Sequence, residues 1–137
     1  MADPKPIVEA LSFIEVHLRE PIAVADIADA AGYSLHHFSR VYNAATYHTP
    51  YSYLIRRRLA EAARALVTTD DLIIDIAFDY QFNSPETFTR ACRRVFDAPP
   101  SRLRDIGYLD PHRLMPALTA DHLAYLEANR ERLRPVF

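Results

Sequence analysis

Residues 76–94 read IAFDYQFNSPETFTRACRR, and residues 27–42 carry an earlier version of the same pattern, IADAAGYSLHHFSRVY. When the two Ile-Ala pairs are aligned, Phe38-Ser39-Arg40 falls on Phe88-Thr89-Arg90 after one extra residue in the turn. Each copy contains a short helical pattern, a break, a serine suited to N-capping and a second amphipathic helix. The sequence therefore predicts a helix-turn-helix motif written twice.

The second helix of each copy separates into an apolar face and a polar face. Apolar residues recur at i, i+3, i+4 and i+7 in both copies, which predicts that one side is buried. Arginine and hydrogen-bonding residues occupy the other side, and these are the groups that base edges and phosphates in DNA require. One such face is usually only a solvated surface, but its repetition favours DNA binding. The polar faces are His36, Ser39, Arg40 and Asn43 in the first copy, and Glu86, Thr89, Arg90 and Arg93 in the second.

Four phrases in this order and spacing resemble the AraC/XylS family of bacterial transcription regulators. They are IADAAGYSLHHFSRVY, TPYSYLIRRRLAEAARAL, DIAFDYQFNSPETFTRACRRVF and APPSRLR, and the resemblance covers roughly residues 7–104. Within the family the chain is most similar to the single-domain MarA/SoxS/Rob subgroup, whose second recognition helix resembles SPETFTRACRRVF. The resemblance implies an all-α, homeodomain-like fold of the AraC type, with two helix-turn-helix subdomains joined by a long central helix.

The expected domain organisation follows from the breaks in the sequence. Residues 1–107 form an AraC-type DNA-binding domain, with helix-turn-helix motifs at about 24–45 and about 72–96. Residues 108–137 form a C-terminal extension, in which Thr119 caps an extra helix from about 120 to 134. We expect that helix to pack back on the domain, to bind a partner, or to begin a further sensor domain.

The linker between the two motifs is expected to be one long helix over about residues 50–67, because Thr49-Pro50 is a strong start signal. About 17 residues at ~1.5 Å each span ~25 Å, enough to hold two recognition helices about one duplex turn (~34 Å) apart. A rigid linker of this kind replaces dimerisation, so one chain is expected to occupy two successive major grooves.

The resemblance implies which side chains meet DNA. On the first recognition helix they are His36, Ser39 and Arg40, with Asn43 on the same polar face; on the second, Pro85, Glu86, Thr87 and Arg90 face the bases, and Arg93 and Arg94 lie nearer the backbone. We expect one arginine of the run at 56–58 to pair internally with Glu61 or Asp75. The candidate phosphate contacts are Arg56, Arg57, Arg102 and Arg104.

The chain departs from its relatives in two ways. Pro85 and Glu86 stand where the subgroup commonly has two amides, and a carboxylate accepts from a cytosine amino group but repels phosphate. We therefore expect the second half-site to have a different base preference, or the protein to use that half-site more weakly. In addition, Tyr47, Gln81 and Asp97 stand where the family generally has glycine. A left-handed residue other than glycine costs roughly 1–2 kcal/mol, so either these turns adopt other geometries or the second half is less stable.

The net charge of −2 is unusual for a DNA-binding chain, because nonspecific affinity comes mainly from neutralised phosphates. Residues 1–107 hold 12 Lys and Arg against 14 Asp and Glu, so the tail does not conceal a basic domain. Ten arginines nevertheless lie on or beside the proposed binding elements. We therefore expect a polarised surface, and binding that weakens steeply as the salt concentration rises.

Several other classes of protein are disfavoured. Cys92 is the single cysteine and cannot form an internal disulfide, which fits a reducing cytoplasm. The family resemblance implies that this is the bacterial cytoplasm, with the protein at the nucleoid. No signal peptide or run of 18 apolar residues is found, so no membrane association is expected. His36 and His37 lack further ligands for a metal. We find no catalytic constellation or phosphate-binding glycine loop, so neither an enzyme nor a cofactor is predicted.

The sequence thus predicts a sequence-specific regulator that binds double-stranded promoter DNA as a monomer. By the resemblance, we expect it to activate transcription through contact with RNA polymerase. The alternative is a protein-interaction module of the same fold that sequesters a partner through its C-terminal helix. The acidic balance, Glu86 and the tail favour that alternative.

Overall fold

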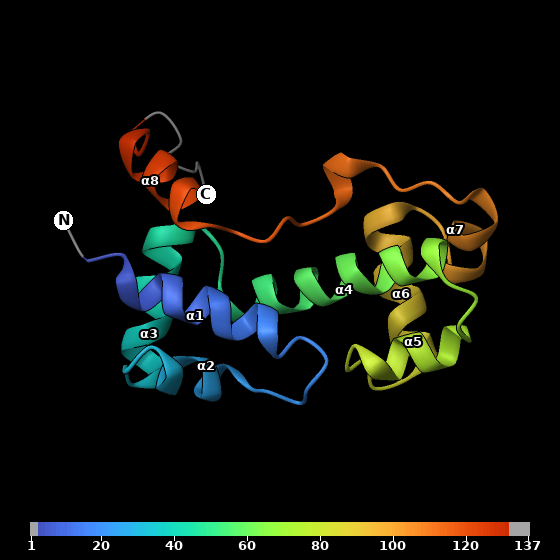
Figure 1. The fold of residues 1–137 in the computed structure, drawn as a ribbon, viewed down its shortest axis with the longest axis horizontal. Coiled ribbons are helices and arrows are strands. Elements are labelled where there is room, and N and C mark those ends of the chain that lie inside the picture. Colours follow the sequence, from blue (N-terminus) through green and yellow to red (C-terminus); the bar gives the residue numbers. More distant parts are fainter. Residues whose placement is uncertain (1–2, 132–137) are drawn as a thin grey trace. The chain divides into compact units, whose positions relative to one another are not determined.

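The computed structural model describes residues 3–131, and all regular secondary structure in that range is helical (Figure 1). Two helix-turn-helix motifs, a long central helix and an extra C-terminal helix make up the fold, as the sequence predicted. The elements are α1 (Lys5–Val16), α2 (Val24–Ala30), α3 (Leu35–Thr46), α4 (Pro50–Thr68), α5 (Ile73–Asp79), α6 (Pro85–Phe96), α7 (Pro100–Ile106), the short 3-10 helix η1 (Pro111–Arg113) and α8 (Ala120–Ala128).

The described chain divides into two compact units, and α4 contributes residues to both. Unit 1 consists of residues 3–17, 22–54 and 117–131, so it contains α1, α2, α3, the start of α4 and α8. Unit 2 consists of residues 18–21 and 55–116, and contains the rest of α4 together with α5, α6 and α7. Each unit therefore holds one helix-turn-helix motif.

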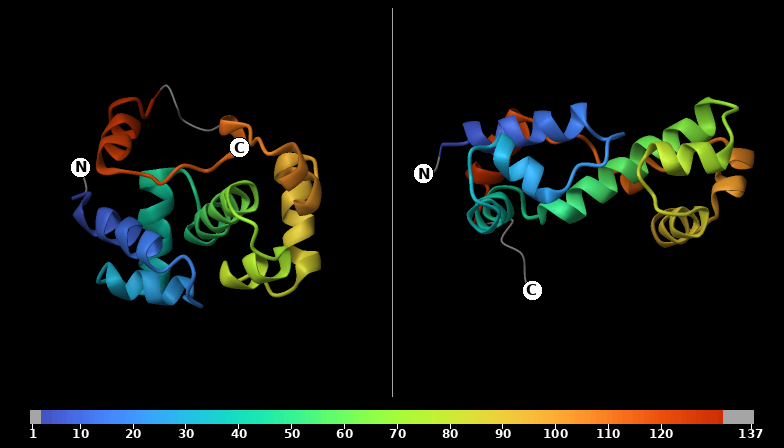
Figure 2. Two further views of the ribbon diagram at one scale, coloured as in Figure 1. Left: turned by 45° about the vertical axis from the view of Figure 1, so that its right-hand side comes forward. Right: turned by 90° about the horizontal axis from the view of Figure 1, so that it is seen from below.

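The core of unit 1 is formed where α1, α2 and α3 pack around one another (Figure 2). The predicted stripe of α1 is buried, including Ile7 and Ile14, because its apolar residues recur at helical spacing. Phe38 and Tyr42 of α3 complete the core, with ring centroids 5.4 Å apart. These contacts fix which side of α3 faces inward.

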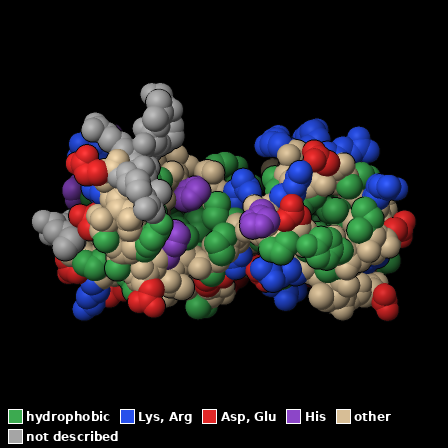
Figure 3. Space-filling view, turned by 90° about the horizontal axis from the view of Figure 1, so that it is seen from above, with side chains coloured by type: hydrophobic (Ala, Val, Ile, Leu, Met, Phe, Trp, Pro, Cys, Tyr) green, Lys and Arg blue, Asp and Glu red, His purple; other side chains and the backbone are tan. Residues whose placement is uncertain are grey.

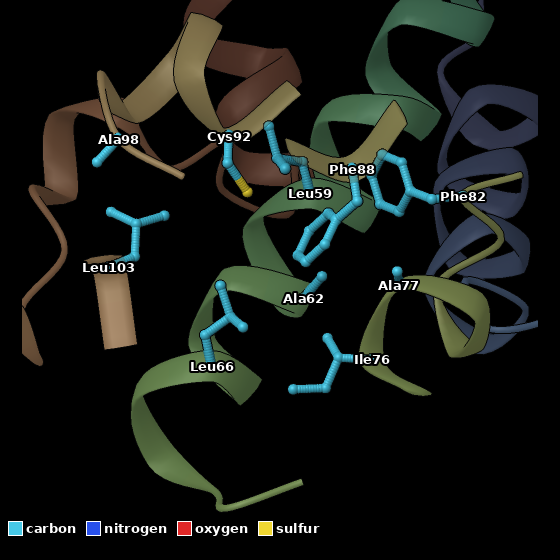
Figure 4. Close-up of a cluster of buried hydrophobic side chains, with 10 residues drawn as sticks. All are labelled: Leu59, Ala62, Leu66, Ile76, Ala77, Phe82, Phe88, Cys92, Ala98 and Leu103. Atoms are coloured by element: carbon cyan, nitrogen blue, oxygen red, sulfur yellow. The ribbon is translucent and has the colours of Figure 1, made fainter. Parts of the chain in front are cut away.

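The core of unit 2 is built in the same way from α4, α5, α6 and α7 (Figure 4). Phe82 and Phe88 lie beside each other with ring centroids 5.0 Å apart. The Cys92 side chain points toward Leu59 of α4 and is fully buried. Phe88 and Cys92 hold the positions in α6 that Phe38 and Tyr42 hold in α3, so the internal repeat extends to the core.

The turns of the two motifs also have matching backbones. In the first turn, the N–H groups of Gly32 and Tyr33 donate to the carbonyls of Asp29 and Ala28, both at 3.0 Å. In the second, Gln81 and Phe82 make the equivalent bonds to Phe78 and Ala77, also at 3.0 Å. Gly32 has φ +79° and Gln81 has φ +68°. A left-handed residue is thus required in both turns, and only the first uses glycine for it.

α1 ends at Val16, and the segment that follows it leaves the helix. The Arg58 guanidinium binds the carbonyls of Leu18 (2.9 Å) and Glu20 (2.7 Å) and holds that segment outside the helix. Asp3 does bond to the backbone N–H of Lys5, at 3.0 Å, as a residue near the start of a helix should.

α5 begins without a side-chain cap, because its N-cap is Leu72 and neither Asp70 nor Asp71 just before it caps the helix. Asp71 is used differently: its backbone N–H donates to the Thr69 hydroxyl (3.3 Å), and its carbonyl accepts from Arg104 (2.7 Å). Local side-chain bonds of this kind compete with capping geometry.

Thr119 caps α8 as predicted, accepting from the backbone N–H of His122 at 3.2 Å. The described helix ends at Ala128, where Asn129 bonds back to the Tyr125 carbonyl at 2.9 Å. The predicted end near Arg134, and Leu133 with it, lies outside the described residues. α8 packs against α3 in unit 1, and Leu123 is buried there. Packing back on the domain, one of the three expected arrangements, is therefore the one found.

Candidate nucleic-acid interface

The first candidate surface is the exposed side of α3. Ser34 caps this helix by accepting from the backbone N–H of His37 at 3.3 Å, as the sequence predicted. Because Phe38 and Tyr42 are buried, the residues between them are turned outward. His36, Arg40 and Asn43 are exposed and Ser39 is half-buried. The structure therefore places all four predicted residues of this helix on one accessible face.

The second candidate surface is the corresponding side of α6. Ser84 caps it by accepting from the backbone N–H of Thr87 at 3.1 Å, and Pro85 occupies the first turn. Glu86 is exposed, whereas Pro85 and Thr87 are half-buried. The Thr87 hydroxyl lies 2.9 Å from the Ser84 hydroxyl and accepts from Arg90 at 3.5 Å. Thr87 is thus already tied to two neighbours on the face from which it was expected to contact bases.

Four predicted arginines are accessible on these helices. Arg40, Arg90, Arg93 and Arg94 are all exposed. No described residue forms a hydrogen bond or ion pair with the side chains of Arg40, Arg93 or Arg94, so these guanidinium donors remain available for an anion. Figure 3 shows arginine side chains at several places on the surface of unit 2, with acidic side chains among them. Within α6, Arg90, Arg93 and Arg94 outnumber Glu86, so this helix is locally positive even though the chain is slightly acidic.

The arginine run at 56–58 has mainly a structural role. Arg57 is 4% exposed; it donates to the Met115 carbonyl at 2.7 Å and pairs with Glu61 at 3.1 Å. The predicted pairing with Glu61 is confirmed, but the phosphate contact expected of Arg57 is wrong for this conformation. Arg58 is also buried. Arg56 is half-buried and reaches the Arg113 carbonyl at 3.4 Å.

Of the two arginines of α7, Arg102 is accessible to a ligand and Arg104 is hydrogen-bonded within the fold. Arg102 is exposed and its guanidinium makes no hydrogen bond to another described residue, so this side chain is accessible to a phosphate. Arg104 is half-buried and donates to the carbonyls of Leu66 (2.9 Å) and Asp71 (2.7 Å). The Leu66 carbonyl lies in the last turn of α4, where a helix terminus leaves carbonyls unpaired, and the Asp71 carbonyl lies in the loop that follows. These two hydrogen bonds hold the guanidinium against the protein and argue against the expected phosphate contact.

Sequence reasoning missed Arg113. Its guanidinium pairs with Asp97 at 2.8 Å and donates to the Val95 carbonyl at 3.0 Å. It thereby ties the segment after α7 to the end of α6. The sequence did contain a pattern that could have identified Arg113, the spacing Asp110-x-x-Arg113. In the structure Asp110 caps η1, and its carboxylate lies 3.7 Å from the Arg113 guanidinium.

Two general features of the described chain bear on the kind of protein. Within residues 3–131 no helix is both long and apolar enough to span a membrane. In the same range, no three His, Cys, Asp or Glu side chains are close enough together to hold a metal ion.

Known proteins share this geometry. A family model described as a helix-turn-helix domain matches residues 27–106. In sequence, the chain is 36% identical to the regulatory protein SoxS of Escherichia coli K12 over 104 residues, which is 76% of this chain and 97% of SoxS. It is 41% identical to YbfP of Bacillus subtilis, an uncharacterized HTH-type transcriptional regulator, over 73% of this chain and 34% of YbfP.

Two further matches extend the comparison. The right origin-binding protein of Escherichia coli K12 is 39% identical over 70% of this chain and 33% of its own length. The chain thus spans about a third of that protein and of YbfP. Among solved structures, the DNA-binding domain of AdpA, determined with a target DNA, superposes with a TM-score of 0.70 and 29% identity over 74% of this chain and 91% of that domain. The chain belongs to the AraC/XylS family of helix-turn-helix transcriptional regulators, which are DNA-binding proteins and not enzymes.

Proposed function

We propose that this protein binds promoter DNA specifically, through the exposed faces of α3 and α6. The observation that carries the proposal is the repeated presentation of exposed arginines, which form no ion pair within residues 3–131, on two serine-capped helices with matching cores. An arginine can form two hydrogen bonds with a guanine edge or bind phosphate oxygens. Each good bidentate base contact contributes about 1–3 kcal/mol of discrimination against the wrong base. The proposed base-facing residues are His36, Ser39, Arg40 and Asn43 of α3, and Pro85, Glu86, Thr87 and Arg90 of α6, with Arg93, Arg94, Arg56 and Arg102 at the backbone.

We further propose that one chain occupies two successive major grooves as a monomer. α4 is a single helix of 19 residues, or ~28 Å at ~1.5 Å per residue. Its continuity supports a fixed spacing between the two recognition helices. The expected site is an asymmetric pair of half-sites on one side of the duplex, in place of a palindrome.

The second half-site is proposed to be the weaker one. Glu86 is exposed in the first turn of α6, where its carboxylate repels phosphate, and Thr87 is engaged by Ser84 and Arg90. Arg93 and Arg94 offset Glu86 on the same helix. The proposed outcome is a preference for cytosine near Glu86 and a larger share of sequence discrimination from α3.

An activating role through RNA polymerase is proposed from the outer side of α5. Ile74 and Phe78 are 46% and 47% exposed, one helical turn apart. The matching positions in α2 are Ala25 and Asp29, so unit 2 alone exposes two large apolar side chains there. An exposed apolar patch rimmed by acids is typical of a protein contact surface. A promoter-bound activator acts at the chromosome, and the proposed location is the bacterial cytoplasm at the nucleoid.

The alternative of a partner-sequestering module is less well supported. Leu123, the apolar residue of α8 that such a partner would need, is already buried in unit 1. Tyr125 is 48% exposed but stands beside polar neighbours.

Site selection from random DNA, followed by a gel-shift titration, tests the proposal. We expect specific binding that Arg40→Ala weakens by about 5- to 150-fold, the equivalent of a lost base contact. Arg64→Ala is the matched control, because Arg64 is an exposed arginine paired with Glu61. Binding that is insensitive to salt and unchanged by Arg40→Ala would support the interaction module instead.

Arg90→Ala tests the two-groove model separately. If it leaves affinity for the selected site unchanged while Arg40→Ala abolishes binding, then only α3 reads sequence. For activation, Phe78→Asp should keep DNA affinity and lower transcription from a target promoter in a purified system. Equal transcription from both proteins would rule out the α5 surface.

A further inference from the structure

A large cavity lies in unit 1 between the start of α1, the C-terminal half of α3 and α8. Its volume is about 710 Å³, within the range of sites that hold small organic molecules. Figures 1 and 2 show α8 next to the C-terminal end of α3, and Arg130 of α8 reaches the Ala44 carbonyl at 3.4 Å. The space is partly open to solvent and partly enclosed by the three helices. A concave, mainly apolar space of this size between helices is a candidate binding site.

The cavity walls are apolar and built largely from small side chains. α3 contributes Val41, Ala44 and Ala45, and α8 contributes Leu123, Ala124 and Ala128. Alanines on facing helices leave the space open, because larger side chains would interdigitate across it. Leu123 is buried and anchors α8, whereas Ala44, Ala124 and Ala128 are exposed toward the open space. An apolar molecule would cover surface that is now in contact with water.

The charged groups at the cavity indicate the polar end of such a molecule. Among the residues 3–131 that line the cavity, the charged ones are Asp3, Glu127 and Arg130. Arg130 pairs with Glu127 at 3.2 Å, and both side chains are about half exposed. Within this described lining, two carboxylates against one guanidinium leave an excess of negative charge. A cationic group is attracted by that excess and an anionic one is repelled.

We propose that this cavity is a binding site for a small apolar molecule carrying an ammonium group, and that the molecule acts as an effector of α3. Val41, Ala44 and Ala45 form its wall, and Arg40 and Asn43 on the same helix carry the proposed DNA contacts. Binding at one face of α3 and DNA binding at the other are then linked, and each changes the affinity of the other by the same factor. The effector role rests on the proposed function; the binding site does not.

Fluorescence titration of the full chain with three pyrene compounds tests the site. Pyrenylmethylammonium, pyrenylmethanol and pyrenecarboxylate share the apolar body and differ in charge. We expect the ammonium compound to bind at least about ten-fold more tightly than the carboxylate, a difference of about 1.4 kcal/mol. Glu127→Gln should narrow that ratio by about three-fold. Equal or tighter binding of the carboxylate, or no binding of any probe, would overturn the proposal.

A variant whose side chain fills the cavity provides a second test of the site, with the affinity for the ammonium probe as the measurement. Ala124→Phe places a ring in the space and should weaken the ammonium probe at least about ten-fold. His122→Phe is the matched control, since His122 lies on α8 but does not line the cavity. Circular dichroism checks that both variants fold, and the charge series on the unaltered protein does not depend on them. Unchanged affinity in a folded Ala124→Phe variant would also overturn the site.

The effector role has its own test. The affinity for a selected DNA site is measured with and without saturating ammonium probe, and we expect a change of at least about three-fold. If the probe binds and DNA affinity stays constant, the effector role is wrong and the site stands. If the protein binds no DNA at all, the probe titration still decides whether the site exists.

Discussion

Tyr47 and Asp97 end the two recognition helices in the same left-handed conformation, each with a φ of 62°. Each residue's N–H donates to the carbonyl four residues earlier, Asn43 and Arg93 respectively. Left-handed backbone costs a β-carbon-bearing residue roughly 1–2 kcal/mol, and glycine avoids that cost while losing some entropy on folding. The first of the two expected outcomes, that these turns adopt other geometries, is therefore wrong, and the relative stability of the second half stays a prediction.

Tyr47→Gly should raise the free energy of unfolding by about 0.5–1 kcal/mol, because the strain is removed and glycine's extra unfolded-state entropy offsets part of the gain. Urea denaturation followed by circular dichroism measures it. Tyr47→Ala is the control, since it removes the ring and keeps the strain. A Tyr47→Gly protein no more stable than Tyr47→Ala would show that strain at this position is negligible.

Asp97→Gly should raise the free energy of unfolding by less than Tyr47→Gly does, or should lower it. Aspartate tolerates the left-handed region better than tyrosine does, and Asp97 pairs with Arg113 at 2.8 Å. That pair is largely solvated, with side chains 75% and 43% exposed, so its contribution is at most about 1 kcal/mol. The comparison of the two variants in the same urea experiment tests whether strain or pairing dominates at the end of α6.

Features that repeat along the sequence, such as apolar spacing, predicted the fold well, whereas features without a repeat did not. The apolar spacing of Phe38 and Tyr42, and of Phe88 and Cys92, fixed the inward faces of both recognition helices, and serine capping fixed where they begin. The left-handed turns were foreseeable because the repeat aligned Gly32 with Gln81. Local sequence thus contained most of the fold and the orientation of the candidate surface.

The arginine roles were not predictable in the same way. Arg57 lies at i+3 from Leu54 on the buried side of α4, but its stabilising partner, the Met115 carbonyl, is 58 residues away. Arg58 and Arg104 likewise bind carbonyls 40 and 38 residues away. A backbone carbonyl has no signature in the sequence, so a buried arginine and a DNA-contacting arginine look alike until the fold is known.

Arg57→Ala is therefore predicted to destabilise the protein by about 2–4 kcal/mol. The change removes the buried side chain of Arg57 and leaves the part-buried Met115 carbonyl without its donor, while Glu61 loses one of its two arginine partners. Arg64→Ala removes the other arginine that pairs with Glu61, but Arg64 is 51% exposed, and the expected loss is under about 0.5 kcal/mol. Thermal or urea unfolding measures both. Similar losses in the two variants would contradict a structural role for Arg57.

Tyr42 and Tyr53 offer a matched pair in the core of unit 1, with ring centroids 6.1 Å apart. The Tyr42 hydroxyl is buried and has no hydrogen-bond partner among the described residues, and burial raises the pKa of Tyr42 well above its usual value. The Tyr53 hydroxyl accepts from the backbone N–H of Leu118 at 2.9 Å. Tyr42→Phe should be neutral or stabilise by about 1 kcal/mol, and Tyr53→Phe should destabilise by about 1 kcal/mol. Urea unfolding of the two variants measures these differences, and Tyr42→Phe should be the more stable of the two. A loss of unfolding free energy in Tyr42→Phe as large as in Tyr53→Phe would show that the Tyr42 hydroxyl has a hydrogen-bond partner.

Cys92 makes the stability of the protein depend on pH in the alkaline range. Burial raises the pKa of its thiol to about 12, against about 8.5 for an unfolded cysteine. Above the unfolded value, the unfolded chain loses its thiol proton while the folded chain keeps it. The unfolded state is then favoured, so this group's contribution is fully present below about pH 8.5 and falls as the pH rises toward about 12.

The Cys92→Ala variant separates this effect from other alkaline titrations. The unfolding free energy of the unaltered protein should fall more steeply between about pH 8.5 and 10 than that of Cys92→Ala, whatever the variant's starting stability. At pH 8 a thiol reagent such as dithionitrobenzoate should react with the folded protein only as fast as unit 2 opens, because Cys92 is fully buried and protonated. Reaction at the rate of a free thiol in the folded protein, or parallel pH profiles for the two proteins, would show that the core around α6 admits solvent.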